Sequence, residues 1–274
     1  MNQKGASRVK LSEVSAQRVV AAAGRRLGSI PERISWAGSS LRRANFDKLE
    51  ALRDRHRGET VVIVANGPSL AAVDMTQLAS VPTISMNRAY LSWDEWGFTP
   101  SYFVSINGLV LQQFASDIAA LPCQKFINTR SRQFYDTSDP GIVLLNTGAS
   151  LTDRFDTTGR KFSTGGTVTF VALQLAYILG FQKVVLIGLD HRFASSTAPN
   201  QSETRDASPD RDHFRPDYFP PGVQWQGPDL VRSEVAYQVA RRAYESAGRE
   251  ILDATDGGAC RVFERASLAD ALDR

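Results

Sequence analysis

The chain has 274 residues, of which 42% are hydrophobic and 22% charged, and this composition is that of an ordinary soluble globular protein. Two widely separated cysteines, Cys123 and Cys260, argue against a disulfide framework and favour a reducing compartment. No apolar run approaches the roughly 18 residues that span a bilayer, and the N-terminus does not resemble a signal peptide, so we predict a cytoplasmic protein.

The net charge of +3 conceals an asymmetry along the chain. Residues 1–58 contain 13 Lys and Arg against 5 Asp and Glu, whereas the remaining residues contain 19 against 24. We predict that residues 1–50 form a basic N-terminal extension, loosely structured or helical. Such a segment is typical of a solvated extension, or of peripheral contact through residues 1–58 with anionic lipid at the inner face of the membrane. Its lack of interleaved aromatic residues argues against a nucleic-acid partner.

From Glu59 onward, apolar β-branched runs alternate with helical periods, which predicts βα units. The expected fold class is α/β: a modified Rossmann-like, mostly parallel sheet with helices on both faces and a long lid loop, forming one domain over residues 51–274. The expected strands lie at 60–65, 82–86, 102–106, 124–127, 142–145, 183–189 and 249–252. The expected helices lie at 46–56, 68–79, 109–120, 167–180 and 229–247.

Residues 194–228 form a long segment without an apolar period and rich in Ser, Pro, Asp and Gly. A loop of this length inside a compact domain is usually either a functional lid or disordered. We predict a lid over the site.

Nearly every expected strand ends at an Asn or Asp. These residues are Asn66, Asn87, Asn107, Asn128, Asn146 and Asp190. The carboxyl ends of parallel strands form the edge where ligands bind, and carboxamides there can contact the hydroxyls and base of a nucleotide. Because Asn and Asp also favour turns, we single out Asn66, Asn87 and Asn107 as ligand-facing.

Two turns have the composition of an anion site. Asn66-Gly67-Pro68-Ser69 follows the first expected strand, and backbone amides at that helix start can bind a phosphate. Thr164-Gly165-Gly166 opens the most apolar helix, where a buried helix dipole favours an anion, although plain capping of a core helix explains it too. Neither turn matches a Walker A loop or a dinucleotide-binding fingerprint.

The best candidate for a general base is His213, which lies among polar and aromatic residues in the expected lid. Arg192, Arg211 and Arg215 are candidates to neutralise a phosphate leaving group. The carboxylates of Asp210 and Asp212 have a spacing that could hold Mg²⁺, but no strand supports them, so we expect no metal site.

Four segments together resemble one bacterial and archaeal family: HRGETVVIVANGPSL, FSTGGTVTFVALQLAYILGFQKVVLIGLDHRF, DHFRPDYF and GREILDATDGGACRVFER. It includes the archaeal 6-hydroxymethylpterin diphosphokinases and the catalytic region of flagellar motility accessory factors. The layout is also similar to the sialyltransferases of glycosyltransferase family 42. The resemblance covers residues 55–268.

The sialyltransferase resemblance implies a CMP-activated keto sugar as donor and no metal. It would place Asn66 and Gly67 at the donor phosphate or ribose and make Asn87 and Asn107 donor-facing. Thr164 and Gly165 match the cytidine-binding turn. Independently of the resemblance, we also expect Ser69, Gly166 and Asp190 to contact the nucleotide. His213 matches the catalytic base. The family's two phosphate-binding tyrosines are missing; Arg192 stands at the first, and Tyr218 is a candidate replacement.

These features together predict an inverting glycosyltransferase that uses a CMP-linked acidic sugar of the sialic acid or Kdo type in surface glycan synthesis. It needs no cofactor, and its partners are the nucleotide sugar and a glycan or glycolipid acceptor. A homo-oligomer is compatible with the sequence. One alternative is a diphosphokinase that uses ATP and Mg²⁺ on a pterin-like alcohol, with Asp190 or Asp212 holding the metal. Another is a non-catalytic nucleotide-binding accessory protein.

Overall fold

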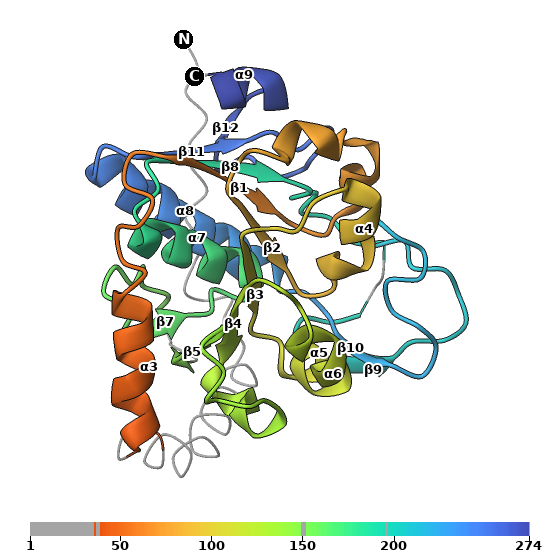
Figure 1. Ribbon diagram of the computed structural model, residues 1–274. Helices are drawn as coiled ribbons and strands as arrows, with labels where there is room; N and C mark the ends of the chain where they lie inside the picture. The colour runs from red at the N-terminus through yellow and green to blue at the C-terminus, as the bar shows by residue number, and fades with distance from the viewer. Residues whose placement is uncertain (1–35, 37–38, 149–151, 195–196, 274) are drawn as a thin grey trace.

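The computed structural model describes residues 36, 39–148, 152–194 and 197–273. An eight-stranded sheet forms the centre of the molecule (Figure 1), and every pairing in it is parallel. In chain order its strands are β1 (Thr60–Val64), β2 (Thr83–Met86), β3 (Tyr102–Ser105), β4 (Gln124–Asn128), β5 (Ile142–Leu145), β8 (Lys183–Ile187), β11 (Glu250–Asp253) and β12 (Glu264–Arg265).

The strand order across the sheet is β12-β11-β8-β1-β2-β3-β4-β5. The chain therefore winds outward from β1 to β5, returns to the other side of β1 at β8, and continues to β12. The reversal lies between β1 and β8, which pair from Thr60 opposite Lys183 to Val64 opposite Ile187. Ligands of open α/β sheets bind beside the carboxyl ends of the strands at such a reversal.

The central strands are apolar because both faces of the sheet are covered. Val61, Ile63 and Ile84 pack with α3, α7 and α8 on one face, while Val62, Val64 and most of the short helices occupy the other face. Figure 1 shows these two layers on opposite sides of the sheet. The helices are α3 (Ser40–Glu50), α4 (Trp93–Trp96), α5 (Gly108–Gln113), α6 (Ala115–Ala119), α7 (Val168–Leu179), α8 (Leu230–Ser246) and α9 (Leu268–Asp273). The described residues also form four short 3-10 helices, which are η2 (Pro68–Ala72), η3 (Met75–Leu78), η4 (Ala89–Ser92) and η5 (Thr129–Phe134).

The predicted α/β fold is confirmed, and a strand lies at each of the seven predicted positions. Helices α7 and α8 also match their predictions closely. The sequence did not indicate β12, because a two-residue exposed strand carries no apolar pattern.

Three predicted helices differ from the structure. The helix expected at 68–79 is two 3-10 helices, because the Asp74 side chain accepts a hydrogen bond from the Thr76 amide and starts a second helix. The helix expected at 46–56 is α3, which ends at Glu50; Asp54 soon afterwards takes a left-handed conformation with φ +53°. The helix expected at 109–120 is divided into α5 and α6 at Phe114.

Helix α3 docks on the sheet, so the part of the predicted extension that the structure describes belongs to the folded domain. The Asn45 side chain forms two hydrogen bonds with the backbone of Leu144 in β5, and Leu49 is buried. Residues 1–35 and 37–38, which make up most of the proposed membrane contact through residues 1–58, lie outside the described residues. Among the helices of the described part, none is both long and apolar enough to cross a membrane.

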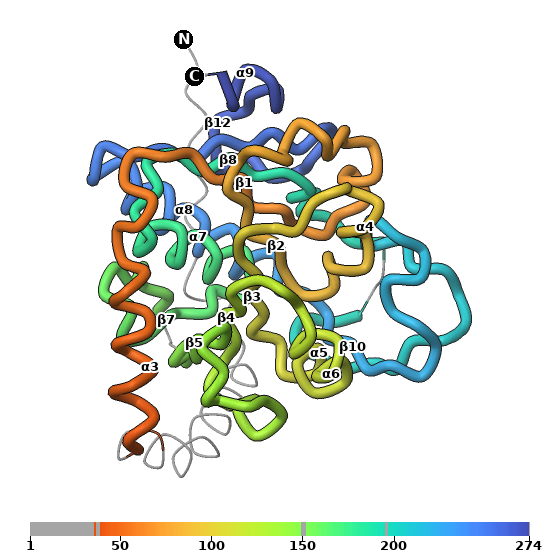
Figure 2. The backbone as a smooth tube through the Cα atoms, viewed as in Figure 1, coloured from red at the N-terminus to blue at the C-terminus, as the bar shows by residue number. Residues whose placement is uncertain are grey.

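Residues 197–228, here called the covering segment, are structured rather than a simple loop. The two short strands β9 (Ser202–Thr204) and β10 (Gln224–Gln226) pair antiparallel, and Tyr218, Phe219 and Trp225 are buried. The segment loops out beside α5 and α6 (Figure 2), where the Gln113 side chain bonds to the backbone of Gln224. Two further short strands, β6 (Thr147–Gly148) and β7 (Phe162–Ser163), pair near the start of α7.

Candidate functional site

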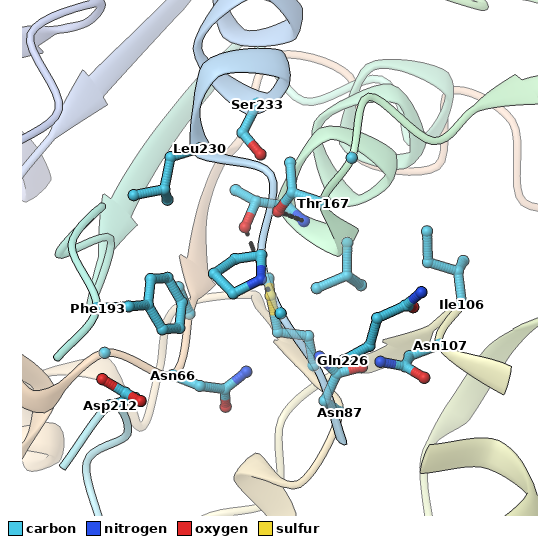
Figure 3. A pocket seen from close by; sticks show the side chains of 18 of the residues that line it. Asn66, Asn87, Ile106, Asn107, Thr167, Phe193, Asp212, Gln226, Leu230 and Ser233 are labelled. Atoms are coloured by element: carbon cyan, nitrogen blue, oxygen red, sulfur yellow. Dashed lines mark hydrogen bonds between the residues drawn. The ribbon is translucent and has the colours of Figure 1, made fainter. Parts of the chain in front are cut away.

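A cavity of about 480 Å³ lies at the carboxyl ends of the strands, around the reversal between β1 and β8. Residues after β1, β2, β3 and β8, the start of α7, one face of α8 and the covering segment line it. Figure 3 shows the side chains that converge on it from these elements. Its size is that of a small-molecule site.

The three asparagines singled out from the sequence, Asn66, Asn87 and Asn107, all line this pocket. The other two strand-end asparagines do not: Asn128 is 3% exposed and caps η5, and Asn146 donates to the Arg160 carbonyl. The row of polar strand ends is thus divided between a group that lines the pocket and ordinary turn formers.

Internal hydrogen bonds orient two of these asparagines. Asn87 Oδ1 accepts from the Ser105 hydroxyl at 2.9 Å, and Asn107 Oδ1 accepts from the Leu109 amide at 2.9 Å as the cap of α5. Both amide NH₂ groups therefore remain as donors to a ligand. Asn66 Oδ1 is buried without a hydrogen-bond partner, a state that a ligand donor would relieve. Figure 3 shows Asn87, Asn107 and Gln226 grouped together in the pocket.

The β1 turn (residues 66–69) already holds an anion from its own chain. Both carboxylate oxygens of Asp190 accept from the Ser69 amide at 3.3 Å, and one accepts from the Ser69 hydroxyl at 2.6 Å. The Gly67 amide donates to the Gly188 carbonyl. A Cβ at Gly67 would overlap the Asp190 carboxylate, which explains the glycine. Gly67, Ser69 and Asp190 thus form a joint between the two central strands, and the turn that was expected to bind phosphate holds a carboxylate of the chain itself.

The α7 turn (residues 164–167) is built differently. Gly165 and Gly166 take left-handed conformations, and a Cβ at Gly165 would lie 2.5 Å from Phe170. The Gly165 amide donates to Asp153, and this carboxylate forms a bidentate pair with Arg232 at 2.8 and 2.9 Å. Arg232, Thr164 and Gly166 line the pocket. The negative charge at this turn is therefore neutralised within the chain.

Arg192 is the pocket's most available cation. It is exposed, lines the pocket, and forms no hydrogen bond or ion pair with any residue that the structure describes. The preceding residue, His191, also lines the pocket and has a left-handed backbone with φ +53°. Burial lowers the pKa of His191, so a neutral imidazole is favoured there. Together they give the pocket one free cation and one neutral imidazole after β8.

His213 lies in the pocket in the arrangement of a general base. Its Nδ1 bonds both oxygens of Asp210 at 2.9 and 3.0 Å, and its ring stacks on Tyr218 with centroids 4.0 Å apart. The next amide, that of Phe214, donates to the Asn66 carbonyl and fixes this loop to the end of β1. Nε2 has no partner among the described residues. A carboxylate on Nδ1 selects the tautomer in which Nε2 accepts a proton.

Tyr218 does not occupy the position of a phosphate ligand. It is 1% exposed, and its hydroxyl accepts from the Arg88 amide at 3.1 Å. Burial raises its pKa, so the phenol stays neutral. We therefore reassign Tyr218 from catalytic candidate to support beneath His213. Arg215 is held by Glu95 and Asp217, and neither it nor Arg211 lines the pocket.

The carboxylates in and beside the pocket accept hydrogen bonds from other groups of the chain. Both oxygens of Asp190 are engaged by Ser69, Asp212 accepts from the Ala194 amide, and Asp210 holds His213. Within the described ranges, no three His, Cys, Asp or Glu side chains gather as metal ligands.

Three contributors were missed from sequence: Asp210 as the partner of His213, the Asp153–Arg232 pair, and Trp225 in the pocket wall. The spacing of Asp210 and His213 by three residues was a usable signal, since both lie in one loop. Asp153 and Arg232 are 79 residues apart, and nothing in the sequence pairs them.

A family model described as 6-hydroxymethylpterin diphosphokinase MptE-like matches residues 40–196. The chain is also similar to the solved structure of a MAf glycosyltransferase from Magnetospirillum magneticum AMB-1, at 14% identity and a TM-score of 0.46, over 81% of this chain and 38% of that one. It therefore spans well under half of that protein. No curated protein sequence matches it significantly. Since the family model covers more than half of its residues, the chain belongs to the MptE-like family.

Proposed function

We propose that this protein is a nucleotide-dependent transferase in which His213 deprotonates an acceptor hydroxyl. More specifically, we propose an inverting glycosyltransferase whose donor is a CMP-linked acidic keto sugar. The observation that carries the proposal is the Asp210–His213 pair, with Nε2 free in a pocket at the sheet reversal. A base held in one tautomer suits proton removal from a hydroxyl near neutral pH.

The proposed reaction is one displacement. Nε2 takes the acceptor proton while the acceptor oxygen forms a bond to the anomeric carbon. The bond from that carbon to the phosphate oxygen breaks on the opposite face, its electron pair leaves with CMP, and the configuration inverts. Asp210 stabilises the imidazolium, which afterwards loses its proton to solvent.

The leaving phosphate is best accommodated near Arg192 and the α7 turn. Arg192 is a pocket cation without an ion-pair partner among the described residues, and the first residues of α7 line the pocket, so both favour developing negative charge. The donor amides of Asn87 and Asn107 then face the nucleoside or sugar. The β1 turn is disfavoured, because the Asp190 carboxylate would repel a phosphate.

A second candidate is the diphosphokinase that the family description names. His213 could equally deprotonate a heterocyclic alcohol, but Mg²⁺ would be required, and the engaged carboxylates argue against its site. A third is a nucleotide-binding accessory role without turnover. A glycan or glycolipid acceptor, inner-membrane contact through residues 1–58, a cytoplasmic location and a homo-oligomer remain proposals.

The test is release of CMP from CMP-Kdo and CMP-sialic acid in EDTA, with a panel of glycan acceptors. We expect turnover by the wild type and a loss of at least about 100-fold in His213→Ala, because a positioned base contributes 10²–10⁴-fold. The control is His56→Gln, since His56 packs on Phe181 outside the pocket. Full activity of a folded His213→Ala protein would refute the proposal, and turnover only with ATP and Mg²⁺ would favour the diphosphokinase.

A further inference from the structure

Arg205 lies next to the Asp210–His213 pair and contacts Asp210. Its Nη2 lies 3.6 Å from Asp210 Oδ2, while His213 Nδ1 lies 2.9 Å from the same oxygen. The side chains of Arg205 and His213 are each 13% exposed, and that of Asp210 is 1% exposed. The three groups therefore form one nearly buried charge array: cation, carboxylate, imidazole.

A buried carboxylate beside a neutral imidazole would be an uncompensated charge. Two outcomes would relieve it: a proton on Asp210, which would change the Nδ1 hydrogen bond, or a proton on His213, which would remove the base. The fixed positive charge of Arg205 is a third way to compensate the carboxylate, because it balances Asp210 while His213 stays neutral. Burial by itself raises the pKa of Asp210, but the contacts with His213, the Asp212 amide and Arg205 outweigh it and lower that pKa overall.

Backbone bonds and a ring contact hold Arg205 in place. Its amide donates to the Val223 carbonyl at 2.8 Å, its carbonyl accepts from Gly222 at 2.9 Å, and its guanidinium lies 5.2 Å from the centroid of the Trp225 ring. Trp225 lines the pocket. Arg205 thus connects the hairpin that covers the pocket with the carboxylate that holds the base.

The other ionisable groups around His213 cannot take over this balance. Asp212 adds negative charge and accepts from the Ala194 amide. Tyr218, stacked on the imidazole, stays neutral because burial raises its pKa. Arg88 lies against the Tyr218 ring, 5.9 Å from its centroid, and forms no ion pair with a described residue.

We propose that Arg205 is a positioning residue for the base: its charge on Asp210 keeps His213 neutral and ready to accept a proton at neutral pH. This inference rests on the proposed function of His213 and deepens it.

The test uses NMR titration of the imidazoles, of which the full chain has three, assigned with His213→Gln. In Arg205→Met we expect the titration midpoint of the His213 imidazole to move up by about one pH unit. A shift of this size is expected when a nearby positive charge is removed from a histidine. Arg205→Lys should restore most of the wild-type midpoint. The matched control is Arg211→Met, which removes an exposed arginine next to Asp210 outside the pocket and should move it little.

Activity gives the second measurement. The acid limb of the kcat/KM profile of Arg205→Met should shift upward by the same amount, with the rate recovering at high pH, which a merely structural defect would not produce. Arg205→Gln replaces Arg205→Met if the latter does not fold. An unchanged His213 midpoint in a folded variant would overturn the role of Arg205 and leave the base intact. Full activity of His213→Ala would instead refute the proposed function, whatever the titration gives.

Discussion

The β1 turn and the α7 turn both precede a helix, but their electrostatics differ. Each contains glycine at the start of a helix, and each has a carboxylate from elsewhere in the chain on its amides. At the β1 turn, Asp190 has no cationic partner among the described residues, so the turn is already occupied by negative charge. At the α7 turn, Arg232 neutralises Asp153. A helix start therefore predicts an anion site only after the chain's own carboxylates have been located.

The largest effect should come from Gly67→Ala. Its Cβ would overlap the Asp190 carboxylate and lie 2.6 Å from the Gly188 carbonyl, so the joint between β1 and β8 must open. We expect urea unfolding to show a loss of about 3 kcal/mol. The matched control is Gly108→Ala at the second Asn-Gly pair, where a Cβ meets nothing within 4 Å. Equal stability of the two variants would contradict the tight joint.

Arg232→Met should damage the other turn. Removing the guanidinium leaves Asp153, whose side chain is 7% exposed, as a lone charge beside the pocket. We expect a loss of about 2 kcal/mol in unfolding free energy and about tenfold weaker nucleotide binding, measured by urea denaturation and calorimetry. Arg57→Met breaks an exposed pair with Asp54 and should cost less than about 0.5 kcal/mol. If nucleotide affinity is unaffected in a folded Arg232→Met protein, the phosphate does not lie at the α7 turn.

The smallest effect concerns His191, which follows Asp190 at the joint. Because burial lowers its pKa, the unfolded chain binds a proton more readily than the folded one. The contribution of His191 to stability therefore decreases as pH falls below about 6.5 and levels off once the folded protein is protonated too. Asparagine tolerates the left-handed backbone at this position, so His191→Asn should remove this pH dependence. We expect the resulting change in the free energy of unfolding to be less than about 1 kcal/mol. Identical pH profiles of unfolding for the two proteins would contradict it.

Sequence patterns predicted the sheet because every strand between buried helices needs an apolar run, as Val61–Val64 and Val184–Ile187 show. They also predicted that Asn66, Asn87 and Asn107 face the pocket. They could not distinguish the two turns, because the partners of Gly67 and Gly165 come from more than ten residues away, at Asp190 and Asp153.

The covering segment also shows what sequence patterns could not predict. Its buried aromatics, Tyr218, Phe219 and Trp225, carry no periodicity because they pack individually rather than along one face of a helix or strand. His213 was singled out from its chemistry, its pairing with Asp210 was missed although the two residues are close in sequence, and the contact of Arg205 with Asp210 became clear only from the fold.

The most direct test of the site is calorimetric titration with CMP in EDTA, for the wild type and Arg192→Ala. We expect the wild type to bind CMP without metal, and Arg192→Ala to bind about tenfold more weakly because a charge-assisted contact is lost, with unchanged stability. Binding of ATP only with Mg²⁺, and no binding of CMP, would contradict the CMP-sugar transferase and favour the diphosphokinase.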